Sequence, residues 1–522
     1  MIRVLSVLLI AYCCSAVAAQ SPEERLDAVQ EFRRFFRSSK VAQDQVEAVR
    51  TLEGMECAEA ADELIGLLDH PTPEVARTVR SVLATYREPA TFAAYTAQIP
   101  ELKDQARLAN LIGVLGASGI RDAFPSIVAR VIADGKKASP EVRFAAARVM
   151  AANGYRDGVE PRLRPMFGDG DPLARMAGVD AAGTLRIKEL GTDIVPLLDD
   201  GSWQVQIAAV KALASLREPA AIGRLIELLG EGGRCAEEAA DALFTITGLD
   251  FGMDAAGWSR TWERLKKQEG WRIPTDEELA KKAASRKKYD ALYGKADATQ
   301  KTTFGGIPTT STKILFIIDV SGSMADLVVE REKFDAGYED FEKLTIVKTE
   351  LQRTIDSLGP DVLFNIVAFA SDTDTWKKHL ARANIVNKSS AKTWVGKLKA
   401  IGGPEAQSLA AAGLGGAANL AAGKTNTYKA LMFPFGIDPD AKRPATGEEG
   451  AMSNPIDTVF FLSDGRPSTG KYTDTAVILD EVRRLNDRYR MVFHSIAIGE
   501  FQKEFLRALA ETNGGVFVDL GR

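Results

Sequence analysis

The C-terminal part of the chain alternates between short, continuous apolar runs and segments whose apolar residues recur at helical spacing. Such runs predict strands that are buried on both faces, and the segments between them predict amphipathic helices. Because strands joined through helices lie parallel in one sheet, we expect a doubly wound, Rossmann-like α/β unit that binds ligands outside the carboxyl ends of its strands. The predicted strands are 313–318, 362–369, 457–463, 491–499 and 515–518, and the predicted helices include 344–358, 480–485 and 505–510.

A different pattern fills residues 21–249. Similar helical segments begin at Pro73, Pro140 and Gln204, and acidic or glycine-rich turns such as 197–201 precede them. The repeat length is about 31 residues, which is typical of stacked helix pairs. Each pair exposes an apolar face that only a neighbouring pair can bury, so we expect an all-α solenoid. This solenoid either adds a binding surface or acts as a plain spacer.

Two segments connect these regions. Trp258, Trp262 and Leu265 share one helical face, and together with Trp271 they are predicted to cap the last repeat. From 281 to 301 the chain is basic and polar, which predicts a solvated helix that runs into a linker ending near Pro308.

Candidate chemistry lies where the predicted strands end. Asp319, Ser321 and Ser323 form an Asp-x-Ser-x-Ser motif directly after the first strand, and Asp464 follows a later strand. Thr425 lies between them in a Gly-Lys-Thr-Asn context. Carboxylate and hydroxyl oxygens suit a hard divalent cation, and a site rich in neutral hydroxyls leaves that cation open to an outside carboxylate.

With these motifs, residues 310–522 resemble a von Willebrand factor A-type domain, and the repeats resemble HEAT repeats. The first resemblance implies a metal-ion-dependent adhesion site that binds Mg²⁺, or Ca²⁺ or Mn²⁺ in its place. Ser321, Ser323 and Thr425 would bind the metal through hydroxyls, and Asp319 and Asp464 directly or through water. A partner protein would supply an Asp or Glu to the remaining position. The implied function is therefore protein binding or scaffolding, with no nucleic acid as a partner.

Two departures from the family pattern surround this motif set. Lys424 replaces the usual glycine before the threonine, so its ammonium either extends into solvent or competes with the cation. Insertions at 326–340 and 402–423 are expected to rim the metal face and to determine partner choice.

Two other functions compete with adhesion. Residues 418–425 nearly match a Walker A motif, which favours a nucleotide-binding enzyme, but no strand is predicted directly before them and Pro434 would cut short a following helix. A structural module without metal is the other alternative. Other catalytic signals are weak, because the three histidines are far apart and accompany no nucleophile motif. His494 lies mid-strand and is expected to be structural, so we expect no enzyme.

The N-terminus predicts export. Residues 1–19 combine a basic start, an apolar stretch and small residues, as a secretory signal peptide does. No later apolar run is long enough to span a bilayer, so the mature chain is expected in the periplasm or outside the cell. Cys57 and Cys235 then remain, and we expect two separate buried thiols. The predicted domains are 1–19 signal peptide, 20–250 repeats, 251–309 cap and basic linker, and 310–522 α/β domain.

Overall fold

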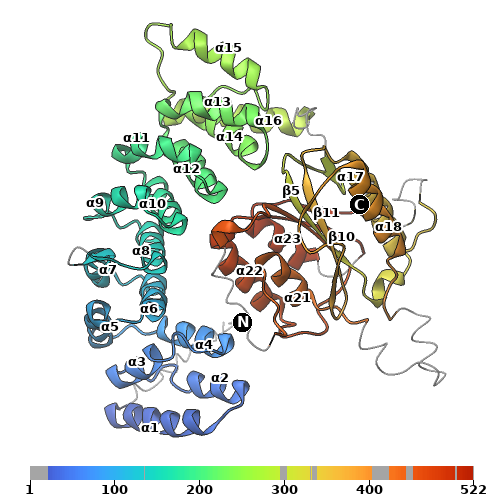
Figure 1. Cartoon of the computed structure of the whole chain (residues 1–522). Coiled ribbons are helices and arrows are strands. Elements are labelled where there is room, and N and C mark those ends of the chain that lie inside the picture. The colour runs from blue at the N-terminus through green and yellow to red at the C-terminus, as the bar shows by residue number, and fades with distance from the viewer. Residues whose placement is uncertain are drawn as a thin grey trace, which may run out of the picture. The chain divides into compact units, whose positions relative to one another are not determined.

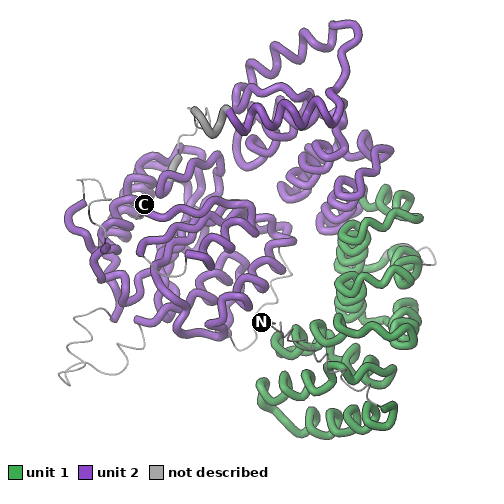
Figure 2. Tube along the Cα trace, turned by 180° about the vertical axis from the view of Figure 1, so that it is seen from behind, with its two compact units in different colours: residues 1–166 green, residues 167–522 purple. Residues whose placement is uncertain are grey.

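The computed structural model describes residues 21–133, 136–293, 302–329, 331, 338–402, 423–441, 451–499 and 503–520. Two compact units divide the chain, residues 1–166 and residues 167–522 (Figure 2). The predicted signal peptide, 1–19, lies outside the described residues, as do 403–422 and most of 330–337. Within the described ranges, no helix has both the length and the apolar composition needed to cross a bilayer.

Unit 1 is helical, as the repeat pattern predicts. Segments rich in alanine and valine pack one helix closely on the next: a Cβ on Gly116 would lie 2.4 Å from a methyl of Val149. Proline is the first residue of several helices. A backbone N–H at this position has no partner within the helix, so the N–H that proline lacks costs no hydrogen bond. The α-helices are α1 Pro22–Ser38, α2 Ala42–Arg50, α3 Ala58–Ile65, α4 Pro73–Leu83, α5 Pro89–Glu101, α6 Gln105–Ser118, α7 Phe124–Val131, α8 Pro140–Ala152 and α9 Glu160–Leu163. The short strands β1 Ile132–Ala133 and β2 Lys136–Lys137 complete the unit.

Unit 2 begins with helices of the same kind. A Cβ on Gly183 would lie 2.7 Å from the Cα of Ala212, so small residues let α10 and α12 approach each other closely. Arg175 on α10 forms two hydrogen bonds with Asp200 in the next repeat, at 2.6 and 2.7 Å. The helices are α10 Pro172–Leu185, α11 Gly191–Ile194, α12 Trp203–Leu216, α13 Ile222–Glu231, α14 Arg234–Thr247, α15 Ala255–Leu265 and α16 Asp276–Tyr293.

The predicted cap is only partly buried. Trp258 on α15 is 2% exposed and donates a hydrogen bond from Nε1 to the Gly252 carbonyl. Trp262, Leu265 and Trp271 are half-buried. The expectation of two buried thiols is also wrong in part: both cysteines are free and Cys235 is buried, but Cys57 is half-exposed because its side chain caps α3.

A seven-stranded sheet forms the centre of the α/β domain, in the order β11-β10-β9-β5-β6-β7, with β8 also paired to β6. All neighbours from β11 to β6 are parallel, whereas β7 and β8 are antiparallel edge strands that the sequence pattern did not predict. The strands are β5 Lys313–Asp319, β6 Leu363–Phe369, β7 Thr373–Thr375, β8 Ala381–Arg382, β9 Thr458–Ser463, β10 Val492–Ala497 and β11 Phe517–Asp519.

Helices cover both faces of this sheet, so each strand is apolar on both sides (Figure 1). Alternate residues of β5 point to opposite faces: Phe316 packs towards α17 and α18, and Ile317 towards α21, α22 and α23. The helices are α17 Lys343–Ser357, α18 Ile385–Lys397, α21 Thr427–Met432, α22 Thr475–Tyr489 and α23 Lys503–Thr512.

The segment predicted as the end of a linker also packs onto the sheet. Strands β3 Thr302–Phe304 and β4 Ile307–Thr309 form a hairpin, whose turn residue Gly305 has a positive φ of 57°. Phe304 is fully buried and its ring centroid lies 5.4 Å from that of Phe316. The predicted limits of the domains stay predictions.

Candidate metal centre

The reversal of strand order places two carboxylates side by side. From β5 the chain continues to β6 on one side and later returns to β9 on the other, so β5 and β9 are adjacent and parallel. Asp319 is the last residue of β5, and Asp464 directly follows β9. Both side chains therefore lie at the carboxyl edge of the sheet, at the point where ligands bind in doubly wound folds. They are 0% and 2% exposed.

The first loop folds back on the carboxylate that precedes it. Asp319 Oδ1 accepts a hydrogen bond of 2.8 Å from the Ser321 backbone N–H. A short 3₁₀ turn, Gly322–Ala325, then brings the Ser321 and Ser323 hydroxyl oxygens to 3.3 Å from each other. Gly322 N–H donates to the Gly423 carbonyl at 3.0 Å, which joins this loop to the one that carries Thr425.

Hydroxyls and one ammonium hold the two carboxylates in place. Ser463 Oγ donates to Asp319 Oδ2 at 2.6 Å, and Ser323 Oγ donates to Asp464 Oδ1 at 2.8 Å. The second oxygen of Asp464 accepts a hydrogen bond of 2.6 Å from Lys343 Nζ. Burial, and after it the nearby charge of Asp464, raises the pKa of Asp319 well above the ordinary value for a carboxyl.

Oxygens of two of the three loops lie close to one point on the third loop. A Cβ built on Gly465 would lie 3.1 Å from Thr425 Oγ1, and 3.6 Å from both Asp319 Oδ2 and Ser323 Oγ. Thr425 is fixed there because its backbone N–H donates to Ser468 Oγ at 2.9 Å. Ser323 Oγ also contacts Ser321 Oγ and Asp464 Oδ1, so the five residues predicted from the motifs lie together.

A cavity of about 540 Å³ opens above these oxygens. Lys424 lies on its rim with an exposed side chain, so it does not fill the centre. The cavity is lined by Gly322, Ser323, Asp326, Lys343, Gly402, Gly423, Lys424, Thr425, Asp464, Gly465, Arg466 and Ser468. Among the described residues there is no group of three or more His, Cys, Asp and Glu side chains that could hold a metal, so the oxygens available here are chiefly hydroxyls.

At the end of the Walker A-like segment, the backbone donors of Thr425 and of the following Asn426 are already engaged. A phosphate cradle needs several unengaged N–H groups that point into one loop. Thr425 N–H is bonded to Ser468, and Asn426 N–H donates to the Ala370 carbonyl at 2.8 Å. The following helix, α21, has six residues and ends before Pro434, as the proline predicts. Residues 418–422 lie outside the described residues.

Two family comparisons agree with this architecture. Residues 337–519 match the sequence model of the von Willebrand factor type A (VWA) domain, and residues 161–243 match that of HEAT repeats. The chain contains a VWA domain preceded by HEAT repeats. The prediction of fold class is therefore confirmed: a helical region precedes an α/β VWA domain with a mostly parallel sheet.

Among curated proteins, the chain is similar to heavy chains of inter-alpha-trypsin inhibitor. It is 24% identical to heavy chain 4 of Mus musculus over 211 residues, which is 40% of this chain and 18% of that protein. It is 32% identical to heavy chain H3 of Mus musculus over 90 residues, which is 17% of this chain and 8% of that protein. The chain thus spans less than a fifth of the length of the relatives it matches.

Solved structures give weaker likenesses. BatB from Bacteroides thetaiotaomicron is 13% identical with a TM-score of 0.25, over 40% of this chain and 90% of that one. The CpcE–CpcF complex of phycocyanin lyase from Nostoc is 16% identical with a TM-score of 0.26, over 53% of this chain and 99% of that one.

Sequence reasoning missed three residues of the VWA domain's site: Lys343, Ser463 and Ser468. Lys343 is the first residue of α17, and a lysine at a helix N-terminus is electrostatically unfavourable, which was the available signal. Ser463 interrupts an otherwise apolar strand directly before Asp464. Ser468 gave no signal, because it reaches Thr425 only through the tertiary fold. Behind the site, His494 is 8% exposed within β10, stacks on Phe460 and accepts a hydrogen bond from the Val516 N–H, as expected of a structural histidine.

Proposed function

We propose that the VWA domain binds an acidic side chain of another protein through a divalent cation, with Mg²⁺ as the first choice and Ca²⁺ or Mn²⁺ as substitutes. Asp319, Ser321, Ser323, Thr425 and Asp464 would hold the cation. The observation that carries this proposal is the convergence of Thr425, Asp319 and Ser323 oxygens within 3.6 Å of the point where a Gly465 Cβ would lie. Hydroxyl and carboxylate oxygens are the donors that Mg²⁺ prefers.

The charge of the cavity rim supports an acidic ligand. Lys424 and Arg466 are exposed and line the cavity above the converging oxygens, and they outnumber the one exposed carboxylate there, that of Asp326. A bound cation would provide Lewis acidity for an outside carboxylate, and the two rim cations would favour the approach of that carboxylate. We expect no bond to be made or broken in the partner, so the proposed role is binding and not catalysis.

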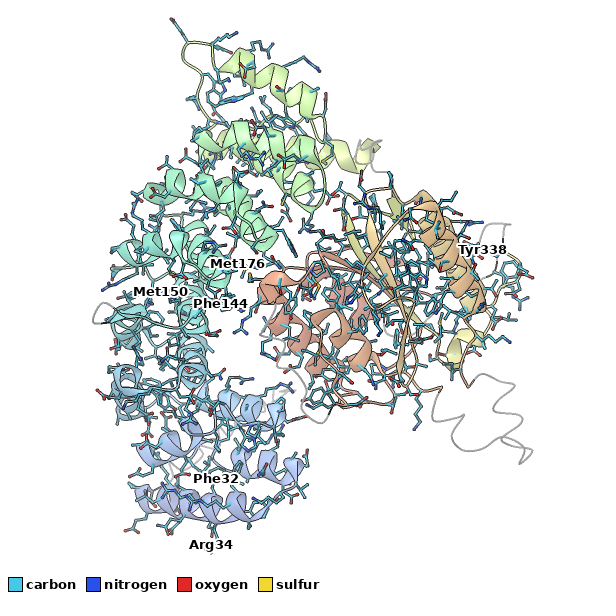
Figure 3. All side chains as sticks on the ribbon, in the orientation of Figure 1. Phe32, Arg34, Phe144, Met150, Met176 and Tyr338 are labelled. Atoms are coloured by element: carbon cyan, nitrogen blue, oxygen red, sulfur yellow. The ribbon has the colours of Figure 1, made fainter. Side chains whose placement is uncertain are left out.

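The other parts of the chain have supporting roles in this proposal. The HEAT repeats would add contact area or reach, as solenoids commonly do. The insertions at 326–340 and 402–423 would flank the ligand. A hydrogen bond holds the end of the first insertion on α17. Tyr338 lies beside this helix, and its hydroxyl donates to Glu350 at 3.0 Å (Figure 3). We infer from residues 1–19 that the protein is exported, to the periplasm or outside the cell.

Isothermal titration of the full chain with MgCl₂ tests this function. The wild type should take up one Mg²⁺, and Asp319→Ala should take up none. Gly465→Ala is a sharper variant, because its new methyl group would occupy the point of convergence while approaching Thr425 Oγ1 no closer than 3.1 Å. It should lose Mg²⁺ binding and keep its melting temperature in EDTA within a few degrees. If Gly465→Ala bound Mg²⁺ as the wild type does, the proposed site would be wrong.

Partner binding is tested by affinity capture from the native extract, once with Mg²⁺ and once with EDTA. A partner retained only with Mg²⁺, and lost on Gly465→Ala, would support adhesion. Equal capture in both buffers would favour a VWA module that works without metal.

A further inference from the structure

Lys343 is placed against the electrostatic preference of its own helix. It is the first residue of α17, where the helix dipole presents partial positive charge and a lysine is disfavoured. Its side chain is nevertheless only 10% exposed. An ammonium is buried at such a position only where a partner compensates for its lost hydration.

The partner is a predicted metal ligand. Lys343 Nζ lies 2.6 Å from Asp464 Oδ2 and 3.4 Å from the Ser323 carbonyl oxygen. The Lys343 backbone N–H donates to the Asp326 carbonyl at 3.0 Å, so the helix start is also tied to the first loop. One lysine, which also lines the cavity, therefore contacts two of the predicted loops.

The surrounding fold keeps room for this side chain. Gly499 follows β10 with a φ of 115°, and a Cβ there would lie 3.4 Å from Lys343 Cε and 3.5 Å from its Nζ. A larger residue with this backbone conformation would be strained, and its Cβ would be in van der Waals contact with the lysine. Lys343 is thus enclosed, in contrast to Lys424, which lines the same cavity with an exposed side chain.

We propose that Lys343 is an internal cation that neutralises Asp464 with or without a metal, and that it thereby lowers the affinity of the site for Mg²⁺. This inference rests on the proposed function. Without metal, the ammonium holds Asp464 and the first loop in place. With metal, Asp319, Asp464, Lys343 and a divalent cation carry a net single positive charge. The Asp326 carboxylate, 4.0 Å from Lys343 Nζ, offsets this charge only in part, because its side chain is 55% exposed and water screens it. Such a centre binds the metal more weakly without an outside anion, so a partner's carboxylate raises the metal affinity that Lys343 lowers.

The test is calorimetric titration of the full chain with MgCl₂ alone, for the wild type, Lys343→Met and the control Lys424→Met. Removing an enclosed positive charge next to Asp464 should lower the Mg²⁺ dissociation constant of Lys343→Met by roughly tenfold or more, because Coulomb interactions at this distance are strong in a partly buried site. Lys424→Met should stay within about twofold of the wild type, because an exposed charge is screened. The rise in melting temperature from EDTA to Mg²⁺ should be larger for Lys343→Met than for the wild type.

The outcomes separate this inference from the proposed function. Mg²⁺ binding by the wild type with no gain in Lys343→Met would overturn the inference alone. Binding by Lys343→Met but not by the wild type would support the inference and overturn Mg²⁺-dependent adhesion. Binding by neither would overturn both.

A folding control completes the test. Lys343→Gln keeps a hydrogen-bond donor for Asp464 without the charge, and it replaces Lys343→Met if that variant does not fold. Folding of either variant only in Mg²⁺ would support the inference, because the metal would then replace the missing cation. If both variants folded in neither buffer, the inference would be wrong.

Discussion

The HEAT repeats and the VWA domain both bury aspartates, but they pair them with different donors. In the repeats, Asp200 accepts two hydrogen bonds from the rigid guanidinium of Arg175 and one from the Ser202 N–H. In the VWA domain, Asp319 and Asp464 instead accept hydrogen bonds from the hydroxyls of Ser463 and Ser323. A guanidinium fork has one geometry, whereas a hydroxyl rotates and serves as donor or acceptor.

This difference distinguishes contacts that only hold two repeats together from contacts that can also bind a ligand. The Asp200 contacts fix one repeat on the next and leave no donor free to change partners. The Ser323 hydroxyl can turn from donating to Asp464 to offering its lone pairs to a cation. Lys343 is the exception within the site, since it is a fixed charge, and it is also the residue that we propose to limit metal affinity.

The largest expected effect comes from breaking one pair in each region. Asp464→Ala leaves the Lys343 ammonium enclosed without its carboxylate and should cost about 3–5 kcal/mol of unfolding free energy. Asp200→Ala removes a partner from Arg175, whose side chain is 17% exposed, and should cost about 1.5–3 kcal/mol, as for a hydrogen bond to a charged group. Urea unfolding checks both costs, and titration with MgCl₂ should show a loss of binding only in Asp464→Ala. Equal costs and equal Mg²⁺ binding in the two variants would contradict the distinction.

Acid should weaken the VWA domain through His494. Burial lowers the pKa of His494 to about 4, below the ordinary value of 6.5. The unfolded chain therefore binds the proton more readily, and stability is lost as pH falls from 6.5 towards 4. The loss should reach about 3 kcal/mol at pH 4. Burial raises the pKa of Asp319 and of Asp457, and these two groups act in the opposite direction, but they do so equally in both proteins. Urea unfolding at pH 7 and pH 4 should therefore show a change in stability that is less favourable by about 3 kcal/mol in the wild type than in His494→Gln, whose amide oxygen still accepts from Val516.

A histidine of the repeats is the control for that experiment. His70 also accepts a hydrogen bond from a backbone N–H, that of Thr72, and burial lowers its pKa too. Because His70 is only half-buried, His70→Gln should change the pH dependence less than His494→Gln does. A larger effect at His70 would contradict the account of His494.

Two glycines should respond differently to the same substitution. Gly183→Ala would place a methyl group 2.7 Å from the Cα of Ala212, between α10 and α12, and should cost about 1–3 kcal/mol through overpacking. The three atoms nearest to a Cβ on Gly465 are oxygens of the proposed site, none closer than 3.1 Å, so Gly465→Ala should cost less than about 1 kcal/mol, near the low end for such changes. Urea unfolding in EDTA compares the two variants. Equal costs would mean that Gly465 is packed as tightly as a helix contact.

The smallest effect is expected at Lys424. Its exposed side chain should contribute no more than about 0.5 kcal/mol to stability. Lys424→Ala should retain Mg²⁺ binding, and neither it nor the wild type should bind ATP in calorimetric titration. ATP binding by the wild type that Lys424→Ala abolished would instead favour the nucleotide-dependent alternative.

The fold followed from the sequence wherever burial is periodic. The continuous run at 313–318 and the helical spacing at 344–358 predicted β5 and α17, because burial on two faces or on one stripe leaves a readable pattern. The edge strands β7 and β8 were missed because they are three and two residues long and half-exposed, so they carry no such pattern. Phe304 was assigned to a linker because the two glycines that follow it are typical of linkers as well as of the turn of a hairpin.

Of the residues in the candidate site, only those that belong to the motifs could be predicted from the sequence. Asp319 and Asp464 each follow an apolar run, and parallel strands bring such ends to one edge. Lys343 lies 121 residues before Asp464, and Ser468 lies 43 residues after Thr425, so which side chain reaches which partner depends on the tertiary fold. A single sequence contains no periodic signal for such contacts.

Anomalous diffraction from crystals grown with Mn²⁺ tests the central claim most directly, since Mn²⁺ shares the oxygen preference of Mg²⁺ and scatters anomalously. The account predicts one strong peak within about 2.2 Å of the Ser321, Ser323 and Thr425 hydroxyl oxygens. It also predicts that Lys343 Nζ stays on Asp464 on the far side of the metal. A VWA domain without a peak at this point, with Ser323 still donating to Asp464, would contradict the account.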